Sequence, residues 1–406
     1  MKEAVVSIRP ADGVSLHIVD NEALLVDESA QALYGLNTSA AFIWCGLEEG
    51  WDAERLADQY AAAFRCSRRD ATEEVRRALD QWRGFNLFAA EGGASSAANY
   101  ADVCVPELEP LAPAPRPSAA AQSVDYTILS QRYRVEFETE AHYRKVHPVL
   151  AQFVAEAGLA ATDSVVQVAT VCFDTDTIIS VAGCQADRVR GDDGLAPAVK
   201  SALVIDAVNR HGFGFFLHAA VVRRDQACML LPAAPGSGKT CMSLALARAG
   251  FAYQTDEIAL LDGDALTVRG VPVCPCVKED AWPVIRNLYP QIDGLEAHRR
   301  VDGKTVKYLP PPDVCDPGSA LAWPVRWLVF PKYMPGSKTE LAILSRVEGL
   351  RRLLEECLAL RTPLDERTVG RLARWIAGIE CRTLTFSSLD EAVGKLRDLC
   401  SQRLCD

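Results

Sequence analysis

Histidine is scarce in this sequence, and no CxxC pair occurs in it. None of the six histidines lies at zinc-ligand spacing from two cysteines. Fourteen cysteines are present, but they are scattered along the chain, and the only close pair is Cys274-Pro275-Cys276. These features argue against a zinc module and favour buried, reduced thiols over a disulfide scaffold.

Long apolar runs and an excess of positive charge are also absent. No stretch of about 18 apolar residues occurs, and the first segment, MKEAVVSIRPADG, lacks the apolar centre of a signal peptide. The formal net charge of -11 argues against broad, non-specific binding to nucleic acid. We therefore expect a cytoplasmic protein that neither spans a membrane nor binds nucleic acid.

The chain has 406 residues, of which 49% are hydrophobic and 24% charged, so it is long enough for two or three folded domains. Residues 91–123 contain five prolines among Ala, Ser and Gly, with few β-branched or aromatic residues. Such a segment buries too little apolar surface to offset its ordering entropy, so we expect a flexible linker. The linker would separate a small domain, residues 1–90, from a large domain, residues 124–406.

The small domain has the pattern of three short strands followed by three helices. The partly alternating segments that predict strands are 15–19, 23–26 and 32–36. The residues that could cap the three helices are Asn37, Thr38 or Ser39 for the first, Asp52 for the second, and Asp70 or Thr72 for the third. This order predicts an α+β, winged-helix-like module. Residues 1–90 contain 15 acidic and 9 basic residues, a balance that argues against DNA as the partner.

The residues around the first expected helix form a recognisable pattern. A strand ends in Leu36-Asn37, Thr38-Ser39-Ala40-Ala41 and Ile43-Trp44 follow, and Gly50 precedes the second helix. This pattern resembles the PqqD-like family, peptide chaperones of pyrroloquinoline-quinone biosynthesis whose module is also the recognition element of enzymes that modify ribosomal peptides. The resemblance implies that a precursor's leader binds as an added strand between the third strand and the third helix. The residues implied to contact the leader are Ala32, Leu33, Tyr34, Arg76 and Arg77.

A generic helical docking or dimerisation module is the alternative interpretation of residues 1–90. The arginines of the third helix are interleaved with acidic residues, which is typical of a solvated helix face.

The large domain contains a phosphate-loop pattern, AAPGSGKT, at residues 233–240. An apolar run at 227–231 predicts a strand before it, and residues 240–249 predict a helix after it. The segment fits the Walker A pattern with alanine in place of the first glycine, in which backbone N–H groups surround phosphate oxygens, the lysine contacts the β- and γ-phosphates and the final hydroxyl binds Mg²⁺. The predicted ATP-binding residues are Ala233, Ala234, Pro235, Gly236, Ser237, Gly238, Lys239 and Thr240. A glycine-rich turn that binds no phosphate is the alternative.

Two adjacent carboxylates, Asp256 and Glu257, follow a short predicted strand, and a predicted hairpin at 258–268 comes next. One carboxylate can anchor a metal ion while the other accepts a hydroxyl proton. His218 lies in an apolar segment before the loop. The alternative interpretation is that Asp256 and Glu257 are a solvated acidic pair without a functional role and that His218 is an ordinary core histidine.

The spacing of these residues resembles that of the HPr kinase/phosphorylase family and its relatives. His218 lies 15 residues before the loop begins, and the acidic pair lies 16 and 17 residues after Thr240. The resemblance implies an α/β P-loop kinase domain of the HPr-kinase/PEP-carboxykinase-like type that uses ATP and Mg²⁺. In this interpretation Thr240 and Asp256 hold the metal. The residues implied to be catalytic are Glu257, Asp256, His218 and Lys239.

The sequence also departs from that family. Thr267 stands where the family usually has an acidic metal-binding residue, and Glu257 stands where the bifunctional enzymes have Asp. The sequence also lacks the N-terminal domain of the bifunctional enzymes and has the peptide-binding module in its place. These departures argue against phosphorylase activity and against HPr as the substrate, and they favour a kinase that modifies peptides.

The rest of the large domain gives two further expectations. Amphipathic helices that would complete the domain are expected at 347–357, 366–379 and 388–399. Some basic residues either form a solvated face or supply charge to phosphates or to an acidic peptide. These residues are Lys278, Arg299, Arg300, Lys304 and Lys307.

Together these features predict an ATP-dependent kinase that phosphorylates a Ser or Thr hydroxyl of a ribosomally synthesised precursor peptide. Residues 1–90 would recruit the precursor through its leader. Two alternatives remain: a kinase for a small molecule such as free serine, and a non-catalytic, nucleotide-gated peptide chaperone. The sequence leaves the oligomeric state open.

Overall fold

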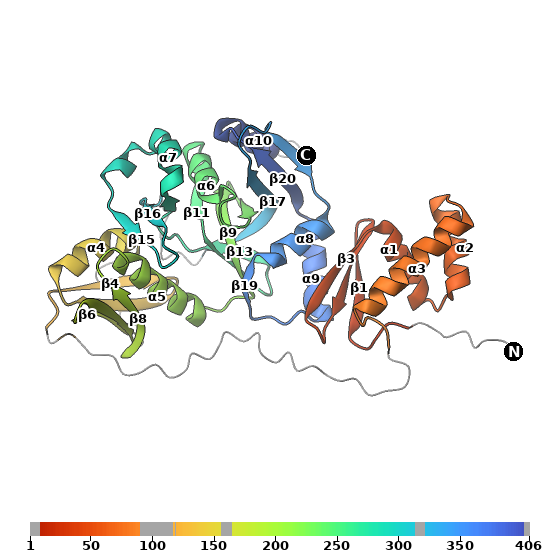
Figure 1. Cartoon of the computed structure of the whole chain (residues 1–406), viewed down its shortest axis with the longest axis horizontal. Coiled ribbons are helices and arrows are strands. Elements are labelled where there is room, and N and C mark those ends of the chain that lie inside the picture. The colour runs from red at the N-terminus through yellow and green to blue at the C-terminus, as the bar shows by residue number, and fades with distance from the viewer. Residues whose placement is uncertain (1–8, 90–116, 118, 156–164, 313–320, 402–406) are drawn as a thin grey trace. The chain divides into compact units, whose positions relative to one another are not determined.

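The computed structural model describes residues 9–89, 117, 119–155, 165–312 and 321–401 (Figure 1). The chain forms two compact units. The first comprises Met1–Val105, Leu344–Glu355 and Leu360–Cys381; the second comprises Pro106–Ile343, Glu356–Ala359 and Arg382–Asp406. Most of the predicted linker, 91–123, lies outside the described residues, but strand β4 begins at Gln122, within its predicted end.

The first unit begins with three strands followed by three helices, which confirms the predicted order. Their bounds are β1 (Val14–Val19), β2 (Glu22–Asp27), β3 (Ala32–Leu36), α1 (Thr38–Glu48), α2 (Ala53–Phe64) and α3 (Arg68–Gly84). The strands pair antiparallel in the order β1-β2-β3. Of the three residues expected to cap the first helix, Asn37 caps α1, and Asp52 caps α2 as expected. Helix α3 begins earlier than predicted, because the Ser67 side chain accepts a hydrogen bond from the Asp70 N–H.

One face of this sheet packs against α1, α2 and α3. Ala23 and Leu25 of β2 are fully buried in a shared core with Trp44 and Trp82. The two indole rings meet edge to face with their centroids 5.0 Å apart. Burial of each large apolar side chain contributes about 1.5–3 kcal/mol, so this face stabilises the module.

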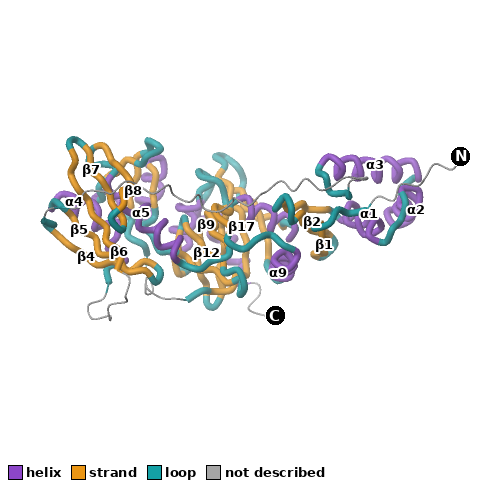
Figure 2. The backbone as a smooth tube through the Cα atoms, turned by 90° about the horizontal axis from the view of Figure 1, so that it is seen from below, coloured by secondary structure: helices purple, strands orange, loops and turns teal. Residues whose placement is uncertain are grey.

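The opposite face of the sheet is covered too. Successive strand residues point to opposite faces, and Leu24 and Val26, which alternate with the core residues, are also 0% exposed. Helices α8 (Arg346–Glu355) and α9 (Glu366–Ala377) contact these strands. Figures 1 and 2 show the sheet between these helices and the α1–α3 group. The sequence predicts both helices but assigns them to residues 124–406, whereas they complete the first unit.

Backbone groups next to α9 hydrogen-bond to the turn between β2 and β3. Glu28 Oε1 accepts a hydrogen bond from the Glu366 N–H at 2.7 Å, and Gln31 Oε1 accepts one from the Leu364 N–H at 2.9 Å. These bonds tie the turn to a segment more than three hundred residues further along the chain.

The second unit contains a five-stranded sheet in the order β4-β5-β6-β7-β8. Only its β5–β6 pair is parallel. Helices α4 and α5 pack on each other and contribute to the same core as this sheet. The bounds are β4 (Gln122–Ile128), β5 (Gln131–Phe137), α4 (Glu140–Leu150), a 3-10 turn (Ala151–Phe153), β6 (Val165–Phe173), β7 (Asp176–Val181), β8 (Cys184–Arg190) and α5 (Leu195–Arg210).

A nine-stranded sheet forms the centre of the second unit. Its main path is β10-β9-β12-β13-β17-β20-β18, with β11 and β19 also paired to β9. Strand β10 also pairs in parallel with β17, so it lies between β9 and β17. The predicted hairpin at 258–268 is confirmed as β12–β13. The bounds are β9 (Phe215–Arg224), β10 (Ala227–Pro232), β11 (Ala252–Thr255), β12 (Ile258–Leu261), β13 (Thr267–Gly270), β17 (Trp323–Tyr333), β18 (Glu340–Ile343), β19 (Cys357–Leu360) and β20 (Glu380–Phe386).

Three further helices, α6, α7 and α10, and a small third sheet complete the second unit. Helix α6 packs with α10 and with β9 and β11. The small sheet has the order β14-β16-β15. The bounds are α6 (Lys239–Arg248), β14 (Cys276–Lys278), α7 (Trp282–Leu288), β15 (Ala297–Arg299), β16 (Thr305–Tyr308) and α10 (Leu389–Ser401), with 3-10 turns at Glu279–Ala281 and Pro290–Gly294. In the described part of the chain, every helix is too short or too polar to cross a bilayer.

Candidate functional site

The glycine-rich loop connects β10 to α6. Gly236 and Gly238 have φ angles of 91° and 93°, a region that L side chains rarely adopt. A Cβ atom on Gly238 would also lie 2.9 Å from Phe386 Cζ. Both the backbone conformation and the close neighbour therefore require glycine at position 238. The predicted strand–loop–helix arrangement is present, with α6 starting at Lys239.

Two polar side chains of this loop, Lys239 and Ser237, have groups that a ligand could engage. Lys239 Nζ donates to the backbone carbonyls of Ala233 and Ala234. Burial lowers the pKa of the Lys239 ammonium to about 8. The Ser237 hydroxyl is buried and has no hydrogen-bond partner among the described residues. An unpaired buried hydroxyl costs about 1–3 kcal/mol, which suits a loop that receives a polar ligand.

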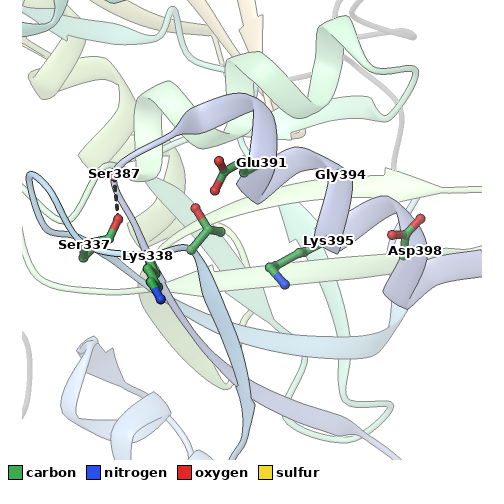
Figure 3. Close-up of a pocket in the computed structure, with 8 residues that line it drawn as sticks. Ser337, Lys338, Ser387, Glu391, Gly394, Lys395 and Asp398 are labelled. Carbon is green, nitrogen blue, oxygen red and sulfur yellow. Dashed lines mark hydrogen bonds between the residues drawn. The ribbon is translucent and has the colours of Figure 1, made fainter.

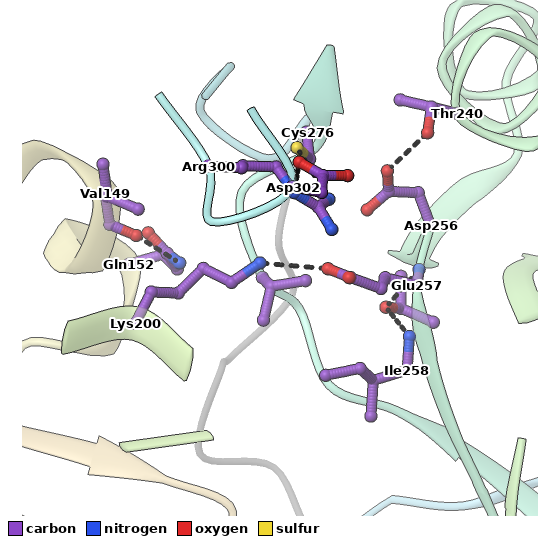
Figure 4. Close-up of polar contacts among 12 residues, drawn as sticks. Val149, Gln152, Lys200, Thr240, Asp256, Glu257, Ile258, Cys276, Arg300 and Asp302 are labelled. Carbon is purple, nitrogen blue, oxygen red and sulfur yellow. Dashed lines mark hydrogen bonds and ion pairs between the residues drawn. The ribbon is translucent and has the colours of Figure 1, made fainter. Parts of the chain in front are cut away.

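The predicted metal pair is brought together. Thr240 Oγ1 donates to Asp256 Oδ2 at 2.8 Å (Figure 4). Tyr253 Oη donates to the other carboxylate oxygen at 3.0 Å. Burial raises the pKa of Asp256, and the neighbouring Glu257 adds to this effect. Within the described ranges, no group of three or more His, Cys, Asp or Glu side chains is arranged to hold a metal ion.

Glu257 is paired with a lysine that the sequence analysis missed. Lys200 Nζ, from α5, lies 3.0 Å from Glu257 Oε2, and the Lys200 side chain is only 7% exposed (Figure 4). The Lys200 ammonium holds the pKa of Glu257 below its usual value, against the effect of burial. A single lysine in the largely apolar sequence of α5 was the only signal, and nothing in the sequence spacing connects it to Glu257.

His218 lies on β9 and reaches the same site. The backbone N–H of His218 donates to the backbone carbonyl of Glu356 at 2.9 Å, and the ring Nδ1 lies 3.6 Å from Glu356 Oε2. Burial and the nearby positive charge of Lys239 lower the pKa of His218. Glu356, directly before β19, is a second neighbour that sequence reasoning missed.

The glycine-rich loop, the acidic pair and His218 line one cavity of about 450 Å³, and Lys200 and Glu356 are outside its lining. Its wall includes residues 235–241, the acidic pair and His218, and it adds Lys278, Arg300 and Lys304 from the small third sheet and its loops. Three of the five basic residues left open by the sequence therefore face this cavity. By contrast, Lys307 Nζ donates to the Ile292 carbonyl at 2.9 Å.

A second, more open hollow of about 620 Å³ lies beside α10 (Figure 3). It shares Ser387 with the first cavity, and its charged residues are of both signs. The lining residues are Ser337, Lys338, Thr339, Ser387, Glu391, Gly394, Lys395 and Asp398.

The predicted leader site lies in the first unit. Ala32, Leu33 and Tyr34 are on β3, which pairs with β2, and no other described strand pairs with its second edge. The Tyr34 ring stacks on Phe85, just after α3, with centroids 5.0 Å apart.

The two predicted arginines of this site already have partners. Arg76 lies 3.5 Å from Asp80, and Arg77 pairs with Glu74, both on their own helix. All four side chains are well exposed, so these are surface pairs of small energetic value.

The family match to known proteins falls in the first unit. Residues 22–87 match the family model described as Coenzyme PQQ synthesis protein D (PqqD). This match confirms the PqqD-like resemblance of that segment and identifies it as a PqqD-like domain. The rest of the chain lies outside the match, so the kinase-like fold of residues 124–406 stays a prediction.

One similar solved structure carries the description "TbiB1 in Complex with the TbiA(beta) Leader Peptide". It is 24% identical, the match covers 21% of this chain and 99% of that chain, and the TM-score is 0.20. The search of curated proteins gave no match.

Proposed function

We propose that this protein is an ATP- and Mg²⁺-dependent kinase that phosphorylates a Ser or Thr hydroxyl of a ribosomally synthesised precursor peptide. The PqqD-like domain would hold the leader of the precursor, as the solved relative's described leader complex suggests. The edge of β3 that no other described strand pairs with supports this role, because a peptide can add there as a strand through main-chain hydrogen bonds.

The glycine-rich loop supports nucleotide binding. The N-terminus of α6 and the loop N–H groups favour phosphate oxygens, and Ser237 has a hydroxyl that lacks a partner among the described residues. Lys239 would leave the carbonyls of Ala233 and Ala234 for the phosphates. Thr240 and Asp256 fit one side of a Mg²⁺ ion, whose other ligands would be phosphate oxygens and water. When bound, the ion would neutralise charge on the phosphates.

Glu257 would act as the base. The attacking hydroxyl oxygen forms a bond to the γ-phosphorus while the bond to the β–γ bridging oxygen breaks, and ADP leaves. Glu257 takes the hydroxyl proton. Its lowered pKa keeps it ionised and able to do so at neutral pH. Lys278, Arg300 and Lys304 would stabilise charge on the transferring group.

The single observation that carries this proposal is the meeting of three features in one cavity. These are the glycine-rich loop, the Thr240–Asp256 pair and the ionised Glu257. The two alternatives from the sequence, a kinase for free serine and a non-catalytic chaperone, predict different products from the same protein.

The test incubates the full chain with Mg²⁺, ATP and candidate precursor peptides, with free serine as a competing acceptor. We expect mass spectrometry to find one phosphoryl group on a precursor Ser or Thr, and none with the matched Lys239→Ala variant. Phosphoserine as the main product would favour the small-molecule kinase. ATP binding without any phosphorylated product would favour the chaperone.

A further inference from the structure

The cavity has two chemically different sides, because β10 lies between β9 and β17. On the β9 side are His218, on β9 itself, and the acidic pair, which follows the β9-paired strand β11. On the β17 side are Tyr333, the last residue of β17, and Phe386, the last residue of the neighbouring strand β20. The glycine-rich loop separates a charged wall from an aromatic one.

The aromatic wall is attached to the loop by short contacts. The Tyr333 N–H donates to the Ser237 carbonyl at 3.1 Å, and the Met334 N–H donates to the Phe386 carbonyl at 2.8 Å. The two aromatic rings are 5.7 Å apart. Phe386 is 2% exposed and supports the pair from within, whereas Tyr333 is 49% exposed. The Tyr333 ring is therefore held in place and still accessible.

The direction of a bound nucleotide follows from this arrangement. The phosphate that is transferred must face Glu257, on the β9 side. The phosphate chain lies along the loop, so the other end of the nucleotide extends towards the β17 side. An aromatic base is a flat π-system that stacks well on an exposed tyrosine.

We propose that Tyr333 is the stacking surface for the base of the nucleotide, an inference that rests on the proposed nucleotide-binding function. Besides Tyr333 itself, Ser387 brings a hydroxyl to that wall, and this hydroxyl already donates to the Ser337 carbonyl at 2.7 Å. Stacking tolerates any base, and this wall offers few groups for hydrogen-bonding a base edge. The site therefore takes purine nucleoside di- and triphosphates with little discrimination between adenine and guanine.

The test measures, by titration calorimetry on the full chain with Mg²⁺, the affinity for ADP, GDP and inorganic tripolyphosphate. Tripolyphosphate has no base and reports on the loop alone. We expect Tyr333→Ala to weaken ADP and GDP about tenfold, the scale of one base–aromatic stack, and to leave tripolyphosphate unchanged. Tyr333→Phe keeps the ring and should bind as the wild type does.

Two controls address folding. Tyr333→Leu keeps apolar bulk without the ring and should lose ADP affinity as Tyr333→Ala does, and Phe173→Ala removes a similarly exposed aromatic outside the cavity without effect. An unchanged ADP affinity in Tyr333→Ala, or an equal loss for tripolyphosphate, would overturn the inference. A wild-type chain that binds neither ADP nor tripolyphosphate would overturn the proposed function itself, and the inference with it.

Discussion

The ion pair between Lys200 and Glu257 bears on stability and, under the proposed function, on chemistry. The Glu257 side chain is 32% exposed towards the cavity, while Lys200 is almost wholly enclosed. Removal of one partner from such a pair leaves the other charge buried without compensation, and this is more costly than removing both. The two roles can be separated by variants that remove one partner or both.

We expect Glu257→Gln to lower turnover strongly while changing ATP affinity little, because the base acts on the acceptor. The same change should destabilise the fold by about 2–3 kcal/mol, since Lys200 loses its anion. The double variant Lys200→Met/Glu257→Gln should regain stability without regaining turnover. Thermal unfolding and steady-state kinetics measure the two effects. Collapse of ATP binding in Glu257→Gln would instead make Glu257 a metal ligand, with His218 the next candidate for the base.

The lowered pKa of Lys239 predicts a pH dependence of nucleotide binding. Without nucleotide, the Lys239 ammonium loses its proton near pH 8. Bound phosphates favour the charged form and raise this pKa, so binding takes up a proton in that region. ADP affinity should therefore fall as the pH rises through about 8. Lys239→Arg, which stays charged, should lack this fall. Calorimetry in buffers of different ionisation enthalpy measures the proton uptake, and equal slopes in both proteins would contradict the assignment.

The predictable part of the site is the part encoded by local spacing. The loop at 233–240 and the acidic pair lie close together in sequence and follow strands, so their residue types and spacing indicate their chemistry. Tyr333 lines the cavity, and Lys200 and Glu356 contact its lining residues Glu257 and His218, only through tertiary packing of β17, α5 and the segment before β19. A single sequence carries no signal for such encounters, which is why these residues were missed.

At the scale of the elements, the positions of α8 and α9 also could not be predicted from a single sequence. Their amphipathic pattern predicts the helices nearly to their observed ends, but an apolar face does not indicate which core it joins. Leu24 and Val26, on the face of β2 that α8 and α9 cover, indicate from the strand's side that a second layer packs there. A strand buried on both faces is uniformly apolar, and β2 has the sequence EALLVD.

This packing predicts that α8 stabilises the PqqD-like domain. A Cβ atom on Gly35 of β3 would lie 3.0 Å from Val347 Cγ1 of α8, so the two elements touch closely there. Val347→Asp would place a carboxylate against the sheet and should cost about 3 kcal/mol or more. Hydrogen exchange of the β2 and β3 amides should become faster, while ADP binding should not change. The matched control is Val301→Asp at a fully exposed position, and equal exchange in both variants would contradict the packing argument.

For the whole molecule, the two units are interleaved in sequence. The sequence predicts a linear division into residues 1–90, 91–123 and 124–406, whereas Leu344–Glu355 and Leu360–Cys381 belong to the first unit. Between them, Glu356–Ala359 belong to the second unit and include a neighbour of His218. A fragment of residues 1–90 alone would lack α8 and α9, so binding studies need the full chain.

The last prediction follows from the proposed function, in which leader recognition and phosphoryl transfer belong to one chain. A flexible connection between a bound leader and the acceptor segment raises the local acceptor concentration to the order of millimolar. A precursor without its leader should therefore show a much higher KM and a similar kcat in the full chain. Separate leader peptide should compete with the intact precursor, yet it should not inhibit phosphorylation of the leaderless peptide.

Proline substitutions in the leader's central segment should weaken this competition strongly, because each removes an N–H that an added strand would donate to β3. Alanine substitutions at the same leader positions are the matched control, since they keep the N–H. The inhibition constants of the two series are compared in one competition assay. Equal inhibition by proline- and alanine-substituted leaders would exclude strand addition at the edge of β3, and it would leave α3 and the surface around Tyr34 and Phe85 as the place where the leader binds.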